Sequence, residues 1–275
     1  MLQELAKSCI RSVIGATSGD TVPVLRGPLR GRRMLRQHGL SHLSMLFGTY
    51  ERLFADAFRR RLPEGNVTYD IGANVGYFSL LAAEQCPSGG AVHAFEPVPE
   101  LVADLEAMMD RNNLQHQVTA HTLALSDSNG SVRFYTPTSA ETGIIATVAA
   151  DRELTEETSV EVPTLTMDTF VFEQGHQPPD VIKLDVEGAE ACVLQGATRV
   201  LQSHGPVVLV EVHGALAAAD VWDVMSPLDY ELALLTEDGE VPMPDREAWV
   251  SLFGGSKWRI HHGVLTPTAR HAKAA

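Results

Sequence analysis

The stretch VTYDIGANVG, residues 67–76, decides the fold that the rest of the chain is expected to adopt. Its β-prone first half ends in Asp70, two glycines then bracket residues 73–75, and an apolar pattern of helical spacing follows. A strand, a tight turn and a helix in this order open a nucleotide-binding α/β unit. We therefore expect an α/β fold with a parallel sheet that helices cover on both faces.

The turn lacks one glycine that a dinucleotide site needs. Such a turn reads Gly-x-Gly-x-x-Gly because the pyrophosphate must approach bare backbone, and here Asn74 holds the second glycine position. A ligand without phosphates tolerates a side chain there and favours an acid near its own positive charge. S-adenosylmethionine is such a ligand, because Asp70 would fit its amino group and Glu96 its ribose hydroxyls. The turn therefore favours this methyl donor over a dinucleotide.

Length and composition indicate a globular α/β domain with extensions. The 275 residues are 44% hydrophobic and hold no long apolar run, so we expect no transmembrane segment. Charges interrupt residues 1–14, which is unlike a signal peptide. Cys9, Cys86 and Cys192 are too far apart for a zinc site or a disulfide framework. These features favour a cytoplasmic location.

The charge of the chain is divided unevenly. The net charge of −14 argues against nucleic acid as a partner. Residues 1–61 hold 11 Lys and Arg against 4 Asp and Glu, whereas residues 62–275 hold 10 against 31. A basic arm therefore precedes an acidic body. We expect the arm to pack on the body and pair its charges; contact with an anionic acceptor or a membrane surface is the alternative.

Two segments are expected, an N-terminal cap over residues 1–62 and a catalytic domain over residues 63–275. The cap is expected to contain a helix over residues 2–14, a basic hairpin with turns at Gly27 and Gly31, and a helix after residue 48. Residues 137–157 are long for a plain connection and are expected to form a mobile or functional loop. Strands are expected at residues 67–71, 91–95, 118–125, 132–135, 181–186, 207–212, 230–235 and 258–264, and helices at residues 77–86, from 99 onwards, 189–203 and 215–225.

Polar residues follow the ends of several expected strands. In an open α/β sheet, ligands gather at the carboxyl ends of the strands. Asp185 and Glu187 are two residues apart, as are Glu211 and His213, so each pair would point to one side if its strand continues that far. Their repetition on successive strands predicts a cleft lined by acids and one imidazole.

Successive motifs of the chain resemble those of FkbM-type methyltransferases, and the resemblance spans residues 48–214. The upstream segment GTYE, residues 48–51, also resembles one often found in that family. The motifs are DIGANVG at 70–76, FEPVP at 95–99, ALSD at 124–127, KLDVEG at 183–188 and EVHG at 211–214.

The resemblance implies a Rossmann-like, seven-stranded class I methyltransferase sheet with a reversed hairpin at one edge. It implies S-adenosylmethionine as the donor and usually a hydroxyl acceptor on a small molecule, natural product, sugar or lipid. By the resemblance, Gly72 and Gly76 would approach the methionine part of the donor, and Ser126 and Asp127 would border its adenine. The residues expected to bind the donor are Tyr50, Glu51, Asp70, Gly72, Asn74, Gly76, Glu96, Pro97, Ser126, Asp127 and Asp185.

His213 is the residue we expect to act as the base. Methyl transfer to a sugar or alkyl hydroxyl requires removal of the hydroxyl proton, and a neutral imidazole can accept it. Asp185, Glu187 and Glu211 are expected to orient this base and tune its pKa. The same four residues offer oxygen ligands and one imidazole, so a divalent cation such as Mg²⁺ or Mn²⁺ is the alternative.

Lys183 and the two adjacent histidines near the C-terminus are interpreted structurally. A lysine in an otherwise apolar strand is costly unless it is paired, so Lys183 is expected to form a buried ion pair with a core acid. His261 and His262 stand beside Arg259 and are expected to be ordinary surface residues.

The sequence thus predicts an S-adenosylmethionine-dependent O-methyltransferase, with two rivals left open. A nicotinamide-dependent oxidoreductase on a similar sheet is disfavoured by Asn74 and by the lack of an obvious Tyr/Lys pair for hydride transfer. A non-catalytic partner subunit of the same fold is disfavoured because Asp70, Glu96, Asp185 and His213 are all present.

Overall fold

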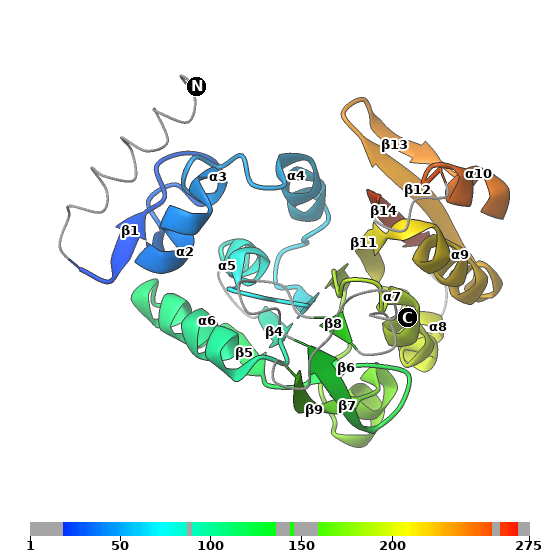
Figure 1. Cartoon of the computed structure of the whole chain (residues 1–275), viewed down its shortest axis with the longest axis horizontal. Coiled ribbons are helices and arrows are strands. Elements are labelled where there is room, and N and C mark those ends of the chain that lie inside the picture. Colours follow the sequence, from blue (N-terminus) through cyan, green and yellow to red (C-terminus); the bar gives the residue numbers. More distant parts are fainter. Residues whose placement is uncertain (1–18, 87–89, 136–143, 146–158, 255–258, 269–275) are drawn as a thin grey trace.

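An eight-stranded sheet forms the centre of the computed structural model, which describes residues 19–86, 90–135, 144–145, 159–254 and 259–268. The strand order is β13-β12-β14-β11-β10-β3-β4-β5, and Figure 1 shows the strands running through the molecule from β5 to β13. The strands are β3 (Val67–Ile71), β4 (Ala91–Phe95), β5 (Val118–His121), β10 (Val181–Leu184), β11 (Val207–His213), β12 (Tyr230–Thr236), β13 (Gly239–Pro242) and β14 (Ile260–Pro267).

The strand directions match the class I methyltransferase sheet and add one strand to it. β5, β4, β3, β10 and β11 are mutually parallel, whereas β14 is antiparallel to both of its neighbours, β11 and β12. The reversed strand therefore lies between β11 and β12 and is not part of an edge hairpin. The edge is instead formed by β13, which is antiparallel to β12. The expected α/β class is confirmed, and the described sheet has eight strands where seven were expected.

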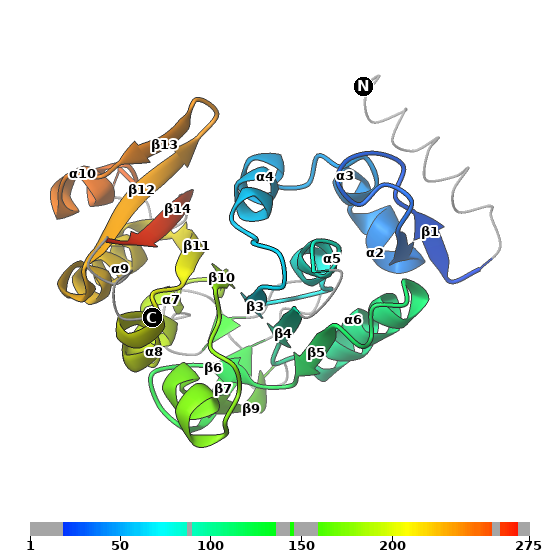
Figure 2. The same cartoon turned by 180° about the vertical axis from the view of Figure 1, so that it is seen from behind.

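Helices cover both faces of the sheet, and each face has its own buried apolar cluster. The first cluster joins α4 (Arg52–Arg60), α5 (Tyr77–Ala83) and α6 (Pro99–Arg111) to the strands. The second joins α7 (Glu190–Gln195), α8 (Thr198–His204), α9 (Gly214–Met225), α10 (Arg246–Ser251), the π-helix η2 (Thr169–Glu173) and the 3₁₀ turn η3 (Ser226–Leu228). In both Figure 1 and Figure 2, α9 and α10 lie beside β12–β14, and α5 and α6 lie toward the other end of the sheet.

The strand expected at residues 118–125 is two strands in two different sheets. The chain turns after His121, whose carbonyl accepts hydrogen bonds from the backbone of Leu123 and of Glu96. Residues beyond this turn enter a four-stranded sheet of order β6-β9-β7-β8. Pro163 inside β9 weakens the strand signal there, so this strand was missed. The second sheet contains β6 (Ala124–Leu125), β7 (Gly130–Tyr135), β8 (Ile144–Ile145) and β9 (Ser159–Leu165).

The helix expected at residues 189–203 is also divided, into α7 and α8. Gly196 lies between them, and a Cβ atom there would stand 2.0 Å from the carbonyl oxygen of Ser126. The close approach of the second sheet therefore requires a glycine at the break. Asp168, from a distant part of the chain, then accepts hydrogen bonds from the backbone N–H groups of Arg199 and Val200 and caps α8.

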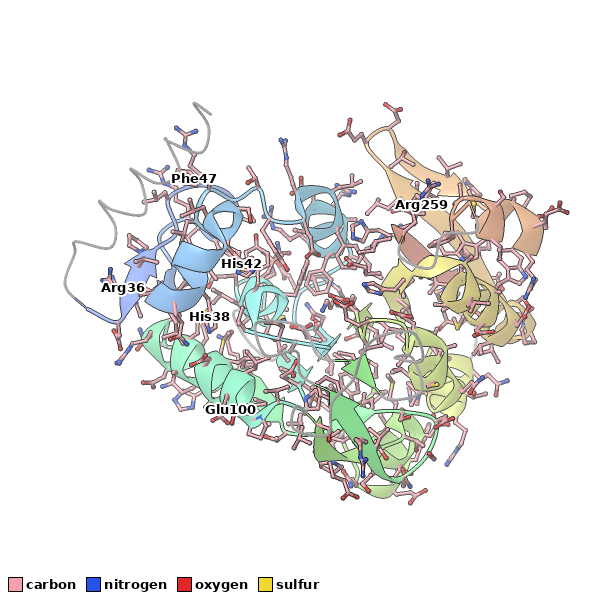
Figure 3. The ribbon with its side chains drawn as sticks, viewed as in Figure 1. Arg36, His38, His42, Phe47, Glu100 and Arg259 are labelled. Carbon is pink, nitrogen blue, oxygen red and sulfur yellow. The ribbon has the colours of Figure 1, made fainter. Side chains whose placement is uncertain are left out.

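The N-terminal segment packs against the sheet as part of its first apolar cluster. It contains the expected hairpin, β1 (Thr21–Pro23) paired with β2 (Arg33–Leu35), followed by α2 (Arg36–Ser41), α3 (Leu43–Leu46) and α4. Arg32 pairs with Glu84 and Arg61 with Glu240, as expected for a basic arm that pairs with the body. His38 faces α6 (Figure 3), where its Nε2 atom lies 2.8 Å from Asp104.

Some expectations fall on residues that the structure does not describe. The helix at residues 2–14 lies outside the described residues, as does the loop at 137–157 apart from β8. Trp258 is likewise outside them, and β14 begins at Ile260. In the described parts of the chain, no helix has both the length and the apolar character required to cross a bilayer.

Three histidines gather on the second face of the sheet around Phe170. His93 Nδ1 lies 3.0 Å from His121 Nε2, and His176 stacks on the Phe170 ring at 3.8 Å between centroids. Burial, together with the neighbouring histidines, lowers the pKa of His93 to about 4, and the same causes lower the pKa of His121 to about 4. Both imidazoles are therefore neutral in the folded chain at neutral pH.

Acidification is expected to destabilise the fold through these histidines. In the unfolded chain they titrate near pH 6.5, so folding opposes their protonation and stability falls as the pH drops from about 6.5 to about 4. Urea unfolding at several pH values in this window measures the effect. His121→Gln retains a hydrogen-bonding group but no titrating ring, so it should flatten the acid slope. Equal slopes for His121→Gln and wild type would contradict this account.

Candidate active site

A cavity of about 200 Å³ opens where the first strand-to-helix turn meets the carboxyl ends of β4, β10 and β11. This is the edge at which ligands bind in open α/β sheets. Its walls combine the turn, the segments after these strands, the second sheet and the N-terminal segment. The residues that line it include His42, Met45, Tyr50, Glu51, Gly72, Ala73, Asn74, Glu96, Pro97, Leu123, Ala124, Leu125, Lys183, Asp185, Glu187 and Glu211.

The turn after β3 requires glycine at position 72 for two reasons. Gly72 has φ +73°, and a Cβ atom on it would lie 1.8 Å from the carbonyl oxygen of Asp185. The N–H groups of Gly72 and Ala73 both donate to the carbonyl of Phe95, each at 3.0 Å. The turn is therefore fixed between β4 and the segment that follows β10, and it presents bare backbone at the cavity wall.

Glu96 is held in place at the cavity by two backbone donors. Its carboxylate accepts hydrogen bonds from the N–H groups of Asn74 and Val98, each at 3.0 Å, and the residue is 6% exposed. Burial raises the pKa of Glu96 to about 7, although the two hydrogen bonds favour the ionised form. A buried carboxylate with part of its accepting capacity directed at a cavity is suited to bind hydroxyl groups.

Lys183 forms the expected buried ion pair and contacts the turn after β3, β3 itself and the end of β10. Its Nζ atom donates to the Gly72 carbonyl at 2.8 Å and lies 3.5 Å from carboxylate oxygens of both Asp70 and Asp185. Burial opposes the charged form, yet Asp185 and Asp70 raise the pKa of Lys183 above its ordinary value. Lys183 therefore remains a cation and ties the turn to β3 and β10.

His213, at the end of β11, is surrounded by carboxylates. Its Nδ1 atom lies 2.8 Å from Glu190 Oε1, and its Nε2 atom lies 3.3 Å from Glu211, 3.7 Å from Glu187 and 3.8 Å from Asp185. Burial alone would lower the pKa of His213, but the hydrogen bond with Glu190 and the charges of the surrounding acids raise it to about 11. The isolated chain therefore carries an imidazolium at neutral pH. The role of His213 as the base stays a prediction, and it would require this proton to leave the ring first.

Asp185 and Glu211 differ in how readily they ionise. Burial raises the pKa of Asp185 to about 7, despite the opposing charge of Lys183. Burial also disfavours ionised Glu211, but the nearby imidazole of His213 and the hydrogen bond with His262 lower its pKa below the ordinary range. Glu211 is thus the firmly ionised carboxylate of the group, and Asp185 titrates near neutrality.

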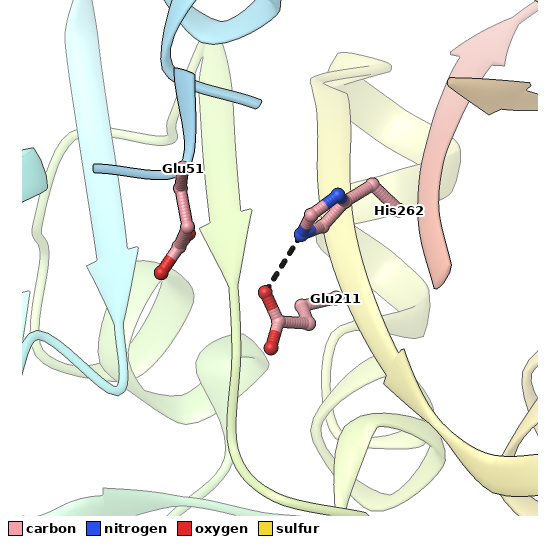
Figure 4. A group of neighbouring side chains, drawn as sticks. All are labelled: Glu51, Glu211 and His262. Carbon is pink, nitrogen blue, oxygen red and sulfur yellow. Dashed lines mark hydrogen bonds and ion pairs between the residues drawn. The ribbon is translucent and has the colours of Figure 1, made fainter. Parts of the chain in front are cut away.

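His262 belongs to this site, and its interpretation as an ordinary surface residue is wrong. Its Nε2 atom lies 2.8 Å from Glu211 Oε2, and its ring stacks on Phe54 of α4 with 4.6 Å between centroids. Figure 4 shows Glu51, Glu211 and His262 directed toward one another from three separate segments. No sequence pattern indicated this contact, because Glu211 and His262 become neighbours only when β14 pairs with β11 in the folded sheet. His261 is half-buried and lies 3.1 Å from the carbonyl of Leu252.

Three cavity-lining side chains stand on strained backbone. Glu51, Asn74 and Glu187 have φ values of 38°, 50° and 54°, in the left-handed region that residues other than glycine rarely adopt. Only two other described non-glycine residues, Asn113 and Asp229, share this conformation. Backbone strain of this kind concentrates at functional sites, because the surrounding structure must impose it.

The structure brings most of the expected site residues to one cavity, and the residues that do not line it are Asp70, Gly76, Ser126, Asp127 and His213. Tyr50, Glu51, Gly72, Asn74, Glu96, Pro97, Asp185, Glu187 and Glu211 line the cavity. Asp70 is fully buried behind the wall, where Ser79 and Lys183 engage it, and Gly76 lies against Leu105.

Ser126 and Asp127 do not line the cavity, because Leu123 and the two residues of β6 form this part of its wall instead. Glu190 was missed: it reads as an ordinary first-turn helix acid, yet it is fully buried against His213.

The family model described as the methyltransferase FkbM domain matches residues 70–232 of this chain. The chain belongs to the FkbM methyltransferase family. It is 32% identical over 187 residues to the hexuronic acid methyltransferase AglP of Haloferax volcanii, covering 67% of this chain and 72% of that protein. It is 29% identical over 251 residues to the 31-O-demethyl-FK506 methyltransferase FkbM of Streptomyces tacrolimicus, covering 80% and 89% respectively.

Among solved structures, methyltransferase FkbM of Methylobacillus flagellatus is similar with a TM-score of 0.46 and 15% identity, covering 84% of this chain and 56% of that one. An O-methyltransferase of Bacillus cereus in complex with S-adenosylhomocysteine gives a TM-score of 0.44 and 11% identity, covering 95% and 89%.

Membership of the FkbM family confirms the resemblance seen in the motifs. The chain is an S-adenosylmethionine-dependent methyltransferase, with S-adenosylmethionine as its methyl donor. Neither the nicotinamide oxidoreductase nor the non-catalytic subunit is supported by these relatives.

Proposed function

We propose that this FkbM methyltransferase methylates a hydroxyl group of a sugar or a small hydroxylated natural product. The observation that carries the proposal is the cluster of Asp185, Glu187 and Glu211 in the same cavity as the Gly72 turn. An acid-lined wall accepts hydrogen bonds from hydroxyl groups. The relatives named for a hexuronic acid and for a 31-O-demethyl macrolide are consistent with an oxygen acceptor.

The donor region is proposed to extend from the turn to the second sheet. Gly72 and Asn74 would approach the methionine part, and Glu96 would accept hydrogen bonds from the ribose hydroxyls. Pro97 and the apolar side chains of residues 123–125 would contact the adenine, in place of Ser126 and Asp127. Asp70 would act from behind the wall by holding Lys183.

The acceptor region is proposed to include the N-terminal segment as a cap. His42, Met45 and Tyr50 reach the cavity from α3 and the segments beside it, and Tyr50 packs edge-on against Tyr77 at 4.9 Å between centroids. These residues lie outside the family match, which begins at residue 70. We therefore propose that residues 1–62 select the acceptor and that the catalytic domain begins near residue 63.

Methyl transfer is proposed to be an in-line displacement. The acceptor oxygen attacks the methyl carbon, the carbon–sulfur bond breaks with its electron pair on sulfur, and S-adenosylhomocysteine leaves as a neutral thioether. The hydroxyl proton passes to a cavity-lining carboxylate among Asp185, Glu187 and Glu211. The donor and acceptor regions of the cavity would hold the attacking oxygen, the methyl carbon and the sulfur in line. This alignment supplies much of the rate enhancement.

Incubation with deuteromethyl-labelled donor and fractionated cell extract tests the proposal. We expect a product that gains one labelled methyl group, and fragmentation should place it on an oxygen. Uronic acids, other sugars and hydroxylated natural products form a defined panel beside the extract. Label on nitrogen or carbon would contradict O-methylation, as would a panel and extract that gain no label although the chain binds S-adenosylhomocysteine.

The affinity for S-adenosylhomocysteine is expected to fall as the pH drops below about 7, the pKa to which burial raises Glu96. A protonated carboxyl group loses part of its capacity to accept hydrogen bonds from the ribose. Glu96→Gln should bind about 10-fold more weakly or worse at about pH 8, because hydrogen bonds to a charged group are lost. Calorimetric titrations at about pH 6 and about pH 8 measure both effects.

Glu106→Gln, an exposed substitution on α6, is the matched control for Glu96→Gln. It should leave the affinity and its pH dependence unchanged. A Glu96→Gln variant with the wild-type pH slope would show that another group causes the dependence.

A further inference from the structure

We propose that Asp185, Glu211 and His213 bind a hard divalent cation of the Mg²⁺ or Mn²⁺ class at the acceptor side of the cavity. One potential ligand atom from each residue converges on the same point, and the three atoms all lie within 4.8 Å of one another. His213 Nε2 is 3.3 Å from Glu211 Oε1 and 3.8 Å from Asp185 Oδ1. Neighbouring ligands of an octahedral ion with bonds of about 2.1 Å stand about 3 Å apart, so small adjustments would complete the geometry.

The far side of each proposed ligand is already held by another residue. Glu190 Oε1 lies 2.8 Å from His213 Nδ1, and His262 lies 2.8 Å from Glu211 Oε2. Lys183 lies 3.5 Å from Asp185 Oδ2. The remaining atom of each side chain is thereby directed into the common space. Metal-binding histidines are oriented in this way, with the second ring nitrogen bonded to a carboxylate.

His213 supplies an independent sign that a ligand belongs there. Its side chain is 10% exposed, and its Nε2 atom is buried without a hydrogen-bond partner among the described residues. A buried polar atom without a hydrogen bond destabilises the fold, because it has lost its hydrogen bonds with water and formed no well-aligned one with the protein. A cation placed between Nε2 and the two carboxylates would satisfy it.

The charge around His213 also favours a cation. Four carboxylates, those of Asp185, Glu187, Glu190 and Glu211, lie between 2.8 and 3.8 Å from its ring nitrogens. One proton on the imidazole neutralises only part of this charge, even with Lys183 nearby, and a divalent cation would take the place of that proton on Nε2. Oxygen ligands with a single imidazole suit Mg²⁺ or Mn²⁺ better than a softer ion.

A neighbouring group is the competitor for the same ion. Glu51, Glu211 and His262 also bring three ligand atoms within 4.8 Å of one another (Figure 4). Both groups use Glu211, but its Oε2 atom is engaged by His262, whereas Oε1 faces His213. We therefore assign the ion to His213 and give His262 the role of orienting Glu211.

The catalytic consequence rests on the proposed methylation of a hydroxyl group. A hydroxyl bound to a divalent cation loses its proton more readily, so the cation would assist the attacking oxygen. Glu187, which lines the cavity and is not assigned to the ion, would be placed to accept that proton.

Titration of the chelator-stripped chain with Mn²⁺, followed by calorimetry and by electron paramagnetic resonance of free Mn²⁺, tests the site. We expect one Mn²⁺ per chain, and at least about 10-fold weaker binding for both Asp185→Asn and His213→Gln. Glu190→Gln, which acts through His213, should weaken binding about 10- to 100-fold. Glu106→Gln should bind Mn²⁺ as wild type does.

S-adenosylhomocysteine titrations of the same samples separate this proposal from the proposed function. If wild type binds S-adenosylhomocysteine but takes up no Mn²⁺ at millimolar concentration, the cation site is refuted and hydroxyl methylation stands. If His262→Gln loses more Mn²⁺ affinity than His213→Gln, the assignment to His213 is wrong. If Mn²⁺ binds as expected but no oxygen gains label, the proposed function fails and the cation site stands.

Discussion

Gly72→Ala is expected to weaken S-adenosylhomocysteine binding by at least about 100-fold, which corresponds to about 2.7 kcal/mol. The new Cβ would lie 1.8 Å from the Asp185 carbonyl oxygen, and backbone cannot move aside as a flexible side chain does. The turn would have to leave β10, and Lys183 would lose its short contact with the Gly72 carbonyl. Calorimetric titration measures the loss, and circular dichroism confirms that the variant is folded.

Gly175→Ala separates steric conflict from backbone strain. Gly175 has φ +78°, close to that of Gly72, but a Cβ atom there meets nothing within 4 Å. The substitution should cost about 1–2 kcal/mol of unfolding free energy and leave ligand binding unchanged. A folded Gly72→Ala that binds S-adenosylhomocysteine as tightly as wild type would show that the turn does not hold the donor.

Lys183→Met is expected to lower the free energy of unfolding by about 3–5 kcal/mol. Loss of the Lys183 ammonium group leaves Asp70 and Asp185 without their shared partner, and Asp70 is fully buried. The Gly72 carbonyl also loses its donor. Urea unfolding measures the change, and the S-adenosylhomocysteine affinity should fall with it because the turn is no longer tied to β10.

Arg246→Met is the control for loss of a positively charged side chain. Arg246 pairs with Asp223 through two hydrogen bonds, but both side chains are about half exposed. Exposed pairs contribute little, so the unfolding midpoint should stay close to that of wild type. Similar losses for Lys183→Met and Arg246→Met would refute the role of Lys183 as a buried link.

The parallel half of the fold could be predicted because its signals are local. β3 and β4 have the bounds that the sequence indicated, since each is a short apolar run followed by a turn. The break after His121 and the division of α7 from α8 depend instead on where the second sheet packs. Contacts between segments that are distant in sequence produce no hydrophobic periodicity. The predictions of one strand at residues 118–125 and one helix at residues 189–203 were therefore wrong.

The candidate site was predictable where its residues follow strands. Glu96, Asp185 and Glu211 all come directly after or at the end of a predicted strand, and all line the cavity. Glu190 and His262 escaped prediction because their burial depends on α7 and β14 meeting β11. The charge around His213 was underestimated for a related reason. Glu190 adds a charge next to its ring that the sequence pattern did not reveal.

Direct comparison of two ligands in one calorimeter tests the central claim, which is that the cavity beside the Gly72 turn accepts a sulfonium nucleoside and not a dinucleotide. We predict saturable, one-to-one binding of S-adenosylhomocysteine to the purified chain and no heat with NADH. Tight binding of NADH with no heat from S-adenosylhomocysteine would contradict the account.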